Sequence, residues 1–232
     1  MLIRIQFLHL DVDIAIALGM KIKYNYVVIE GNIGAGKTTL ASKISEQFNA
    51  QLILEHFSDN PFLPKFYNDP DKYSFPLELS FLASRYKQLK EELVPQNLFK
   101  SFTVADYYFM KSLVFAASTL KEDEYNLYRQ IFYIIYGTLP KPDIYVYLHI
   151  NPDRLLHNIE RRGRNYEKSI TKEYLQKIQD SYFSFFKQNP ENKYLVIDLN
   201  EIDFVANQND YSKIIDTIFF DDYPVGLNMV IL

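Results

Sequence analysis

The chain has 232 residues and a formal net charge of −4 at pH 7, with 48% hydrophobic and 23% charged residues. These proportions are those of an ordinary globular protein. The negative net charge leaves no basic field for a polynucleotide backbone, so we expect no nucleic-acid partner. The chain contains no cysteine, which excludes disulfides and a cysteine nucleophile and fits a cytoplasmic protein.

The first residues are apolar and need a separate interpretation. Asp11 and Asp13 interrupt the run over residues 1–19, so its apolar part is too short to span a membrane, and no small-residue cleavage site follows. The segment could be an extra edge strand, an unordered extension, or an untranslated leader if translation starts at Met20. We expect an extension outside the core, one domain over residues 20–232, and no membrane partner.

Strand patterns then alternate with helix patterns to the end of the chain. The expected strands are 26–29, 52–54, 102–105, 143–150 and 194–199, and the expected helices are 38–48, 77–93, 111–120, 124–138, 153–162, 171–188 and 210–219. Residues 58–76 are polar and carry the turn signals Asn60-Pro61 and Asp69-Pro70. The alternation predicts the α/β class, with a five-stranded parallel sheet covered by helices on both faces.

A phosphate-binding loop follows the first strand. It matches the pattern G-x-x-x-x-G-K-[ST] with Gly31, Asn32, Ile33, Gly34, Ala35, Gly36, Lys37 and Thr38, and Thr39 continues into the helix. Glycines allow backbone N–H groups to surround phosphates at a helix N-terminus. Lys37 would reach the β- and γ-phosphates, and the Thr38 hydroxyl would reach Mg²⁺. The loop predicts binding of ATP or GTP.

Two carboxylates stand where strands end, which is where open α/β sheets bind ligands. Glu55 follows the second strand and could accept the proton of an attacking hydroxyl, or be a solvated loop acid. Asp106 follows the third strand and is the candidate partner of Mg²⁺. Its competing interpretation is a helix N-cap, because the helix expected from Lys111 begins nearby.

The sequence Arg161-Arg162-Gly163-Arg164 lies between two expected helices. Such a run suits a mobile lid that closes on phosphates, although basic loops are often only solvated. The chain has neither an Asn-Lys-x-Asp motif nor an Asp-x-x-Gly after the third strand, which argues against a regulatory GTPase. The loop, the acids and the arginines together favour a kinase.

From about Tyr24 to its end, the chain resembles the deoxynucleoside kinase family, and within it the bacterial deoxyadenosine and deoxyguanosine kinases. The similarity lies in GNIGAGKTT, in the long segment that follows Glu55, in LHNIERRGRNYEKSI and in VIDLNEIDF. These segments resemble the family's phosphate loop, substrate segment, arginine lid and donor-adenine loop. The resemblance implies a P-loop kinase fold with an arginine lid, ATP as phosphate donor, Mg²⁺ as cofactor, a small-molecule deoxynucleoside substrate and a homodimer.

The resemblance also implies roles for individual residues. The catalytic set would be Lys37, Arg162, Arg164 and Glu55, with Glu55 as general base on the 5′-hydroxyl. Tyr67 and Glu167 would bind the 3′-hydroxyl of the substrate, and Glu78, Arg85 and Phe115 would surround its base. Asp106 would also lie in the substrate site. Thr38 and Asp106 would hold the metal. Asp203 and Phe204 would lie in the donor-adenine loop, and Asn158 stands where a further lid arginine is common.

Two departures from the family pattern affect these roles. The family's acid-Arg-Ser triplet is missing its arginine, so Lys111 or a lid arginine would have to replace that charge. Glu78 replaces a glutamine, and an ionised carboxylate only accepts hydrogen bonds. Deoxyadenosine, deoxycytidine and deoxyguanosine carry an exocyclic amine that can donate, so they fit Glu78 better than thymidine, and the resemblance favours the purines.

Three alternatives stay open at the level of sequence. A thymidylate-type nucleoside monophosphate kinase would share this fold, but it needs more positive charge in the acceptor site than Arg85 provides. A P-loop ATPase without a small-molecule acceptor would leave Glu55, Tyr67 and Glu167 without a shared purpose. The missing arginine would also be compatible with a degenerate nucleotide-binding module.

Overall fold

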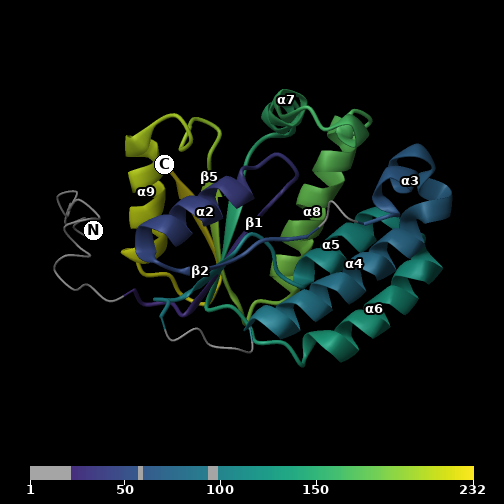
Figure 1. Ribbon diagram of the computed structural model, residues 1–232, viewed down its shortest axis with the longest axis horizontal. Helices are drawn as coiled ribbons and strands as arrows, with labels where there is room; N and C mark the ends of the chain where they lie inside the picture. The colour runs from purple at the N-terminus through teal and green to yellow at the C-terminus, as the bar shows by residue number, and fades with distance from the viewer. Residues whose placement is uncertain (1–21, 57–59, 94–98) are drawn as a thin grey trace.

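A six-stranded parallel sheet forms the centre of the chain, in the order β2-β3-β1-β4-β5-β6 (Figure 1). The computed structural model describes residues 22–56, 60–93 and 99–232. The strands are β1 (Tyr26–Gly31), β2 (Gln51–Ile53), β3 (Thr103–Ala105), β4 (Ile144–His149), β5 (Lys193–Asp198) and β6 (Gly226–Ile231). Because all six run in one direction, their carboxyl ends meet at one edge of the sheet, where ligands bind in such folds.

Helices cover both faces of the sheet (Figure 1). They are α2 (Lys37–Phe48), α3 (Leu63–Asn68), α4 (Pro70–Leu93), α5 (Met110–Thr119), α6 (Glu122–Tyr136), α7 (Pro152–Arg162), α8 (Lys172–Gln188) and α9 (Gln208–Phe219), with a short 3-10 helix, η1 (Asn165–Glu167). Helices α2 and α9 pack on one face, and α4, α5, α6 and α8 pack on the other. None of these described helices is long and apolar enough to cross a membrane.

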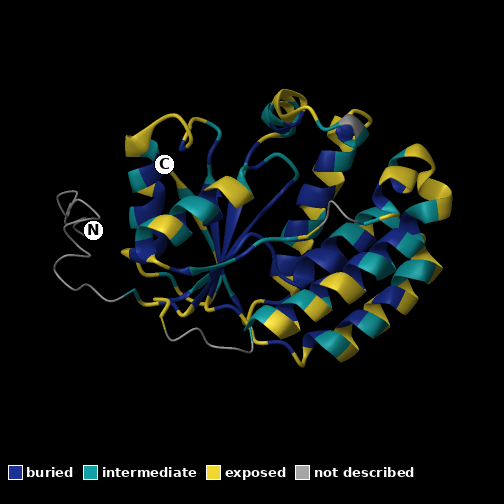
Figure 2. Cartoon of the chain, viewed as in Figure 1, coloured by how far each residue is buried: buried dark blue, intermediate teal, exposed yellow. Residues whose placement is uncertain are grey.

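Strand β1 shows why the chain forms this sandwich. All six of its residues are buried, and Figure 2 shows the central strands of the sheet in the dark blue of buried residues. Val27 and Ile29 pack into the core cluster on the α2 side, whereas Val28 packs into the cluster on the α5 side. A strand that is buried on both faces requires a continuous apolar run, and Val27-Val28-Ile29 provides it.

The structure corrects the predicted number of strands from five to six. Strand β6 pairs with β5 along its whole length, from Lys193↔Gly226 to Asp198↔Ile231. It is an edge strand whose side chains are alternately exposed, with Met229 and Ile231 largely open to solvent. Its pairing depends on backbone hydrogen bonds rather than on burial, so the short apolar run after Phe219 gave little signal.

The segment expected to form turns contains helical structure instead. Helix α3 lies within it, and α4 begins at Pro70 rather than at Leu77, with Pro76 inside the helix. Proline is favoured at the first helical position, where its missing N–H has no intrahelical partner, so Asp69-Pro70 marks a helix start. The predicted extension over residues 1–19 lies outside the described residues.

Candidate active site

The phosphate loop joins β1 to α2 and has the backbone that its glycines allow. Gly34 and Gly36 adopt positive φ angles of 83° and 86°. A Cβ atom on Gly36 would lie 2.9 Å from the ring of Phe204, so glycine is required there by space as well as by conformation. The loop therefore packs directly against the segment after β5.

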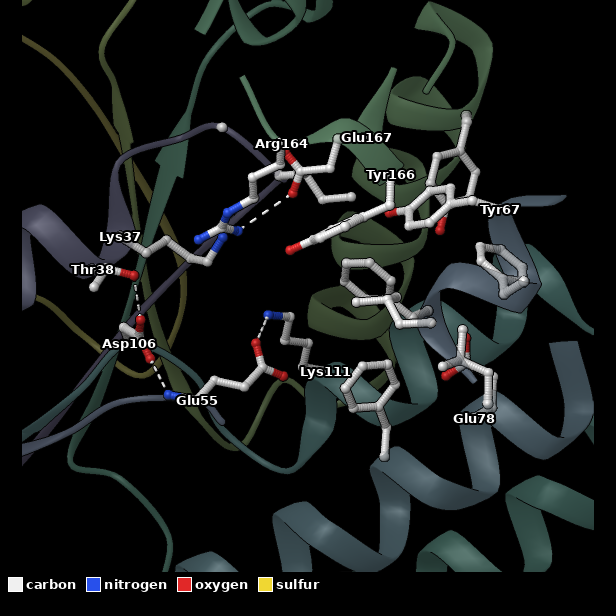
Figure 3. Close-up of a pocket in the computed structure, with 18 of the residues that line it drawn as sticks. Lys37, Thr38, Glu55, Tyr67, Glu78, Asp106, Lys111, Arg164, Tyr166 and Glu167 are labelled. Carbon is white, nitrogen blue, oxygen red and sulfur yellow. Dashed lines mark hydrogen bonds and ion pairs between the residues drawn. The ribbon is translucent and has the colours of Figure 1, made fainter. Parts of the chain in front are cut away.

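Lys37 lies at the start of α2 and lines two cavities, one of which is shown in Figure 3. Its ammonium group donates to the backbone carbonyl of Asn32 at 2.8 Å. Burial and the positive charge of Lys111 lower the pKa of Lys37 to about 8. The side chain of Asn32 points away from the loop interior and donates to the carbonyl of Leu175 in α8. Asn32 therefore fixes the loop to the fold, and only its backbone faces Lys37.

Asp106 connects the phosphate loop to the end of β2. Its Oδ2 accepts from the Thr38 hydroxyl, and its Oδ1 accepts from the backbone N–H of Glu55 at 2.8 Å. The N-cap of α5 is Phe109, so the helix-cap interpretation of Asp106 is wrong. A hydroxyl and a carboxylate oxygen are ligands that Mg²⁺ accepts, usually together with waters and substrate phosphates. Thr38 and Asp106 fit such a site.

Glu55 is held by two cations, Arg85 and Lys111, and Figure 3 shows the contact with Lys111. Arg85 contacts its Oε1 through Nε at 2.8 Å and Nη2 at 2.7 Å, and the ammonium group of Lys111 contacts its Oε2. Burial opposes ionisation, but Lys111 and Arg85 outweigh it and lower the pKa of Glu55 to about 2. Lys111 thus brings a positive charge from α5 to Glu55, which makes it the candidate replacement for the missing arginine. The solvated-loop interpretation of Glu55 is wrong, because its side chain is 9% exposed.

The lid arginines lie against Glu167. Arg162, at the end of α7, makes hydrogen bonds of 2.6 Å to both carboxylate oxygens of Glu167, and Arg164 approaches Oε1 at 3.4 Å. Glu167 is only 5% exposed, whereas both arginines are about one-third exposed. Asn158 donates to the carbonyl of Gly34 at 3.0 Å and ties α7 to the phosphate loop. The helix that leads into the lid is therefore in direct contact with the phosphate loop.

Aromatic side chains line the cavity beyond Glu55. Tyr67 from α3 stacks on Tyr166 from η1, with ring centroids 5.9 Å apart, and both line the cavity with Phe81 and Phe115. Arg85 lies over the Phe81 ring at 4.7 Å. Flat apolar walls of this kind suit a planar ligand.

Glu78 lies at the end of this cavity opposite to the phosphate loop (Figure 3). Its side chain comes from α4 and is 2% exposed. Oε1 accepts from the Thr119 hydroxyl at 2.9 Å, whereas Oε2 has no hydrogen-bond partner among the described residues. Burial raises the pKa of Glu78 to about 7, despite the opposing charge of Arg85. The expectation of a carboxylate that only accepts is therefore incomplete, because the carboxyl titrates near neutral pH.

A second cavity lies between the phosphate loop, α7 and the segment after β5. Thr39, Asn158, Asp203 and Phe204 line it. The Phe204 ring is buried against Gly36, and its carbonyl accepts from Lys43 at 2.9 Å. Asp203 turns the backbone by accepting from the N–H groups of Val205 and Ala206 at 3.1 Å. This pair shapes the cavity wall through packing and turn geometry.

Arg154 was missed by the sequence reasoning. Its guanidinium donates to the carbonyls of Leu199, Asn200 and Ile202, which lie just before Asp203. An arginine in the first turn of a helix is usually solvated, so the sequence carried no signal for this role. Arg154 fixes the segment that closes the second cavity.

Glu30 is a second residue that the sequence reasoning missed. It is fully buried at the end of β1 and accepts from the backbone N–H of Tyr108 at 2.9 Å and the hydroxyl of Tyr182 at 2.8 Å. Burial raises the pKa of Glu30 to about 7, although Lys111 and Lys37 attract its charge. An acid that ends a wholly apolar strand was the signal that could have found it.

Comparisons with known proteins agree with this geometry. The deoxynucleoside kinase family model matches residues 27–221. A deoxyguanosine kinase of Bacillus subtilis (strain 168) is 41% identical over 194 residues, which cover 82% of this chain and 93% of that protein. A deoxyadenosine kinase of Dictyostelium discoideum is 33% identical, and the match covers 78% of this chain and 74% of that protein.

A solved structure extends the agreement to three dimensions. The deoxyadenosine kinase from M. mycoides with bound dATP has a TM-score of 0.71 at 26% identity, with 83% of this chain and 98% of that chain covered. The match to the family model spans most of the domain, including the phosphate loop, Glu55, Asp106 and the lid. The chain belongs to the deoxynucleoside kinase family.

Proposed function

We propose that this deoxynucleoside kinase transfers the γ-phosphoryl group of ATP to the 5′-hydroxyl of a purine deoxynucleoside. The observation that carries the proposal is the position of Glu55. Its carboxylate is ionised and lies in the same cavity as Lys37 and Thr38 of the phosphate loop. An acceptor hydroxyl beside Glu55 would therefore lie next to the terminal phosphate.

In this proposal each charged group has a separate task. Glu55 orients the 5′-hydroxyl and takes its proton, which a carboxylate of low pKa does late, as the new P–O bond forms. Lys37, Arg162 and Arg164 stabilise the charge of the transferring group, and Lys111 does so beside Glu55. Thr38 and Asp106 would hold Mg²⁺, which would supply positive charge that neutralises the phosphates.

The sugar would lie between Glu55 and the lid. Tyr67 and Glu167 line this part of the cavity, and Arg162 and Arg164 already contact Glu167. We propose that Glu167 and the Tyr67 hydroxyl bind the 3′-hydroxyl of deoxyribose. Because the same carboxylate contacts the lid arginines, sugar binding would be coupled to the position of the lid.

The purine preference rests on the relatives and on Glu78. The B. subtilis relative is named a deoxyguanosine kinase and the D. discoideum relative a deoxyadenosine kinase. Glu78, Arg85 and Phe115 line the end of the cavity where the base would lie. We expect deoxyguanosine as the better substrate, because the chain is more similar to that B. subtilis protein than to the D. discoideum one.

A homodimer through the outer face of α6 completes the proposal. Leu127, Tyr133 and Ile134 on this helix are large hydrophobic side chains with 51%, 46% and 76% exposure. Leu127 and Ile134 are seven residues apart, so they lie on one side of the helix. Ile134→Glu should convert a dimer to a monomer in light scattering, whereas a monomeric wild-type protein would contradict the proposal.

A phosphoryl-transfer assay tests the function directly. Mg·ATP is supplied with each of the four deoxynucleosides, with each deoxynucleoside monophosphate, and without acceptor. We expect conversion of deoxyguanosine, and more slowly of deoxyadenosine, to the 5′-monophosphate. Turnover only with a monophosphate would indicate the thymidylate-type alternative, and turnover only without an acceptor would indicate an ATPase; either result would contradict the proposal.

A further inference from the structure

Glu78 is unusual because one of its buried carboxyl oxygens has no partner. Oε1 accepts from Thr119, whereas Oε2 is buried and unpaired among the described residues. Leaving a buried polar atom unpaired is costly, so such an atom needs a reason to exist. The side chain lines the cavity in which the nucleoside would bind. A ligand that fills this cavity can supply the missing hydrogen bond.

The spacing along α4 places Glu78 at the height of a nucleobase. Arg85 contacts Glu55, beside which the 5′-hydroxyl would lie, and Glu78 is seven residues earlier on the same helix. Seven residues of α-helix span about 10 Å. A nucleoside with its 5′-oxygen at Glu55 therefore reaches Glu78 with the far edge of its base, which is the Watson–Crick edge.

The two purines present opposite hydrogen-bonding groups at this edge. Guanine carries N1–H and an N2 amine, which are both donors, whereas adenine carries N1 as an acceptor and N6–H as a donor. A carboxylate can accept both guanine hydrogens. A carboxylic acid can donate to adenine N1 while its other oxygen accepts from N6–H. Each protonation state of the same side chain therefore fits one purine and opposes the other.

We propose that Glu78 reads both purines through its protonation state, binding guanine as a carboxylate and adenine as a carboxylic acid, so that the enzyme's preference between deoxyguanosine and deoxyadenosine depends on pH. The inference rests on the proposed function and deepens it by naming how the base is chosen. The alternative is that Glu78 acts as a glutamine would, with hydrogen-bonding groups that do not change with pH.

The surroundings of Glu78 permit this titration near neutral pH. Burial raises the pKa of Glu78 to about 7. The charged and titratable groups that act on it from the packed elements are Tyr67 of α3, Arg85 of α4, Lys111 of α5, Tyr128 of α6, Tyr174 of α8 and Glu55 after β2. Burial raises the pKa of all three tyrosines, so they stay neutral.

The remaining charges act in opposite directions. Arg85 and Lys111 favour the ionised form of Glu78, and Glu55 disfavours it. None of these groups has to change its charge for Glu78 to titrate. The carboxyl can therefore gain or lose a proton without disrupting the ion pairs around Glu55.

A competition experiment isolates this effect. Deoxyguanosine and deoxyadenosine are mixed with Mg·ATP, and the ratio of their monophosphate products is measured from about pH 6 to about pH 8. Other titrating groups affect both substrates alike and cancel in the ratio. We expect the deoxyguanosine-to-deoxyadenosine ratio of kcat/KM to rise about tenfold per pH unit, or about 100-fold over the range.

Two variants provide the controls. Glu78→Gln removes the proton equilibrium, so its ratio should not change with pH. Thr119→Val removes the hydrogen bond that stabilises the carboxylate, so its ratio should be several-fold lower than that of the wild-type enzyme at each pH, with the slope retained. A wild-type ratio that is constant or falls with pH overturns the inference. An equal rise in Glu78→Gln, or an unchanged ratio in Thr119→Val, overturns it as well.

Failure of the underlying function has a different signature. If neither purine deoxynucleoside is converted at any pH, the kinase proposal fails and the inference falls with it. If both are converted at a ratio independent of pH, the kinase proposal stands and only the inference fails.

Discussion

The ammonium group of Lys111 contacts Oε2 of Glu55, while Arg85 holds the other carboxylate oxygen. Lys111 comes from the first turn of α5, and its side chain is only 9% exposed. A buried carboxylate between two cations is ionised and fixed in orientation, which is what a hydroxyl acceptor site requires. We propose that Lys111 takes the place of the arginine that the family pattern lacks, because it is in contact with Glu55.

Replacing Lys111 should therefore damage catalysis more than folding. In Lys111→Met, Glu55 keeps its contact with Arg85 but loses the cation beside Oε2. We expect kcat/KM to fall by about 10²–10³. Lys111→Arg should recover part of the loss. Steady-state phosphorylation of deoxyguanosine measures the effect, with the exposed Lys87→Met on α4 as a matched control. A Lys111→Met enzyme as active as wild type would contradict this role.

The pH profile of the same variant tests separately whether Lys111 lowers the pKa of Glu55. Because Lys111 helps to lower the pKa of Glu55 to about 2, its removal should move that pKa back toward the ordinary value of 4.5. Wild-type kcat should show no acid limb from Glu55 above about pH 4, whereas Lys111→Met should lose activity as the pH falls toward about 5. Identical acid limbs in the two enzymes would count against the ion pair.

Glu55→Gln tests the proton acceptor itself. The amide retains the shape of the side chain but cannot take the proton of the 5′-hydroxyl, so turnover should fall by about 10²–10⁴. ATP binding should change little, because Glu55 does not line the second cavity with Thr39, Asp203 and Phe204. Single-turnover kinetics and calorimetric ATP titration separate the two effects. Unchanged turnover would remove Glu55 from the catalytic role.

The pair of Arg162 and Glu167 separates lid function from sugar binding. Arg162→Ala should lower kcat more than it weakens nucleoside binding, because the guanidinium acts on the transferring phosphate. Glu167→Ala should raise the KM for deoxyguanosine, with a smaller effect on a 3′-deoxy analogue that lacks the hydroxyl. Steady-state kinetics with both nucleosides measure this, with the exposed Lys168→Ala as control. A pure affinity loss in Arg162→Ala would place that arginine outside the lid role.

Stability should depend on pH through Glu78. Its folded pKa of about 7 exceeds the ordinary 4.5, so its favourable contribution is complete below about pH 4.5 and is lost as the pH rises through 7. Glu78→Gln has no such loss. The free energy of unfolding of Glu78→Gln minus that of wild type should therefore increase by up to roughly 3 kcal/mol between about pH 5 and about pH 8.

Urea denaturation at several pH values measures this difference. The buried Glu30, whose pKa is also raised, is present in both proteins and cancels in the comparison. A difference in unfolding free energy that does not vary with pH would show that folding does not raise the pKa of Glu78.

The sequence by itself determined the parts of this site that are continuous in the chain. The phosphate loop needs eight adjacent residues between a strand and a helix, so its chemistry is local. Glu55 and Asp106 could also be placed, because parallel strands bring their carboxyl ends to one edge. The five strands expected from apolar runs are all present, since burial on two faces requires such runs.

Only the tertiary structure decided the contacts between distant segments. Strand β6 depends on backbone pairing with β5, and Lys111 meets Glu55 across 56 positions of sequence. Burial raises the pKa of Glu78, and the charges that act on it come from Arg85 on its own helix and from Glu55 and Lys111 on other segments. The sequence shows which ionisable side chains are present. The burial and the neighbouring charges that set the pKa of a carboxyl exist only once the chain has folded.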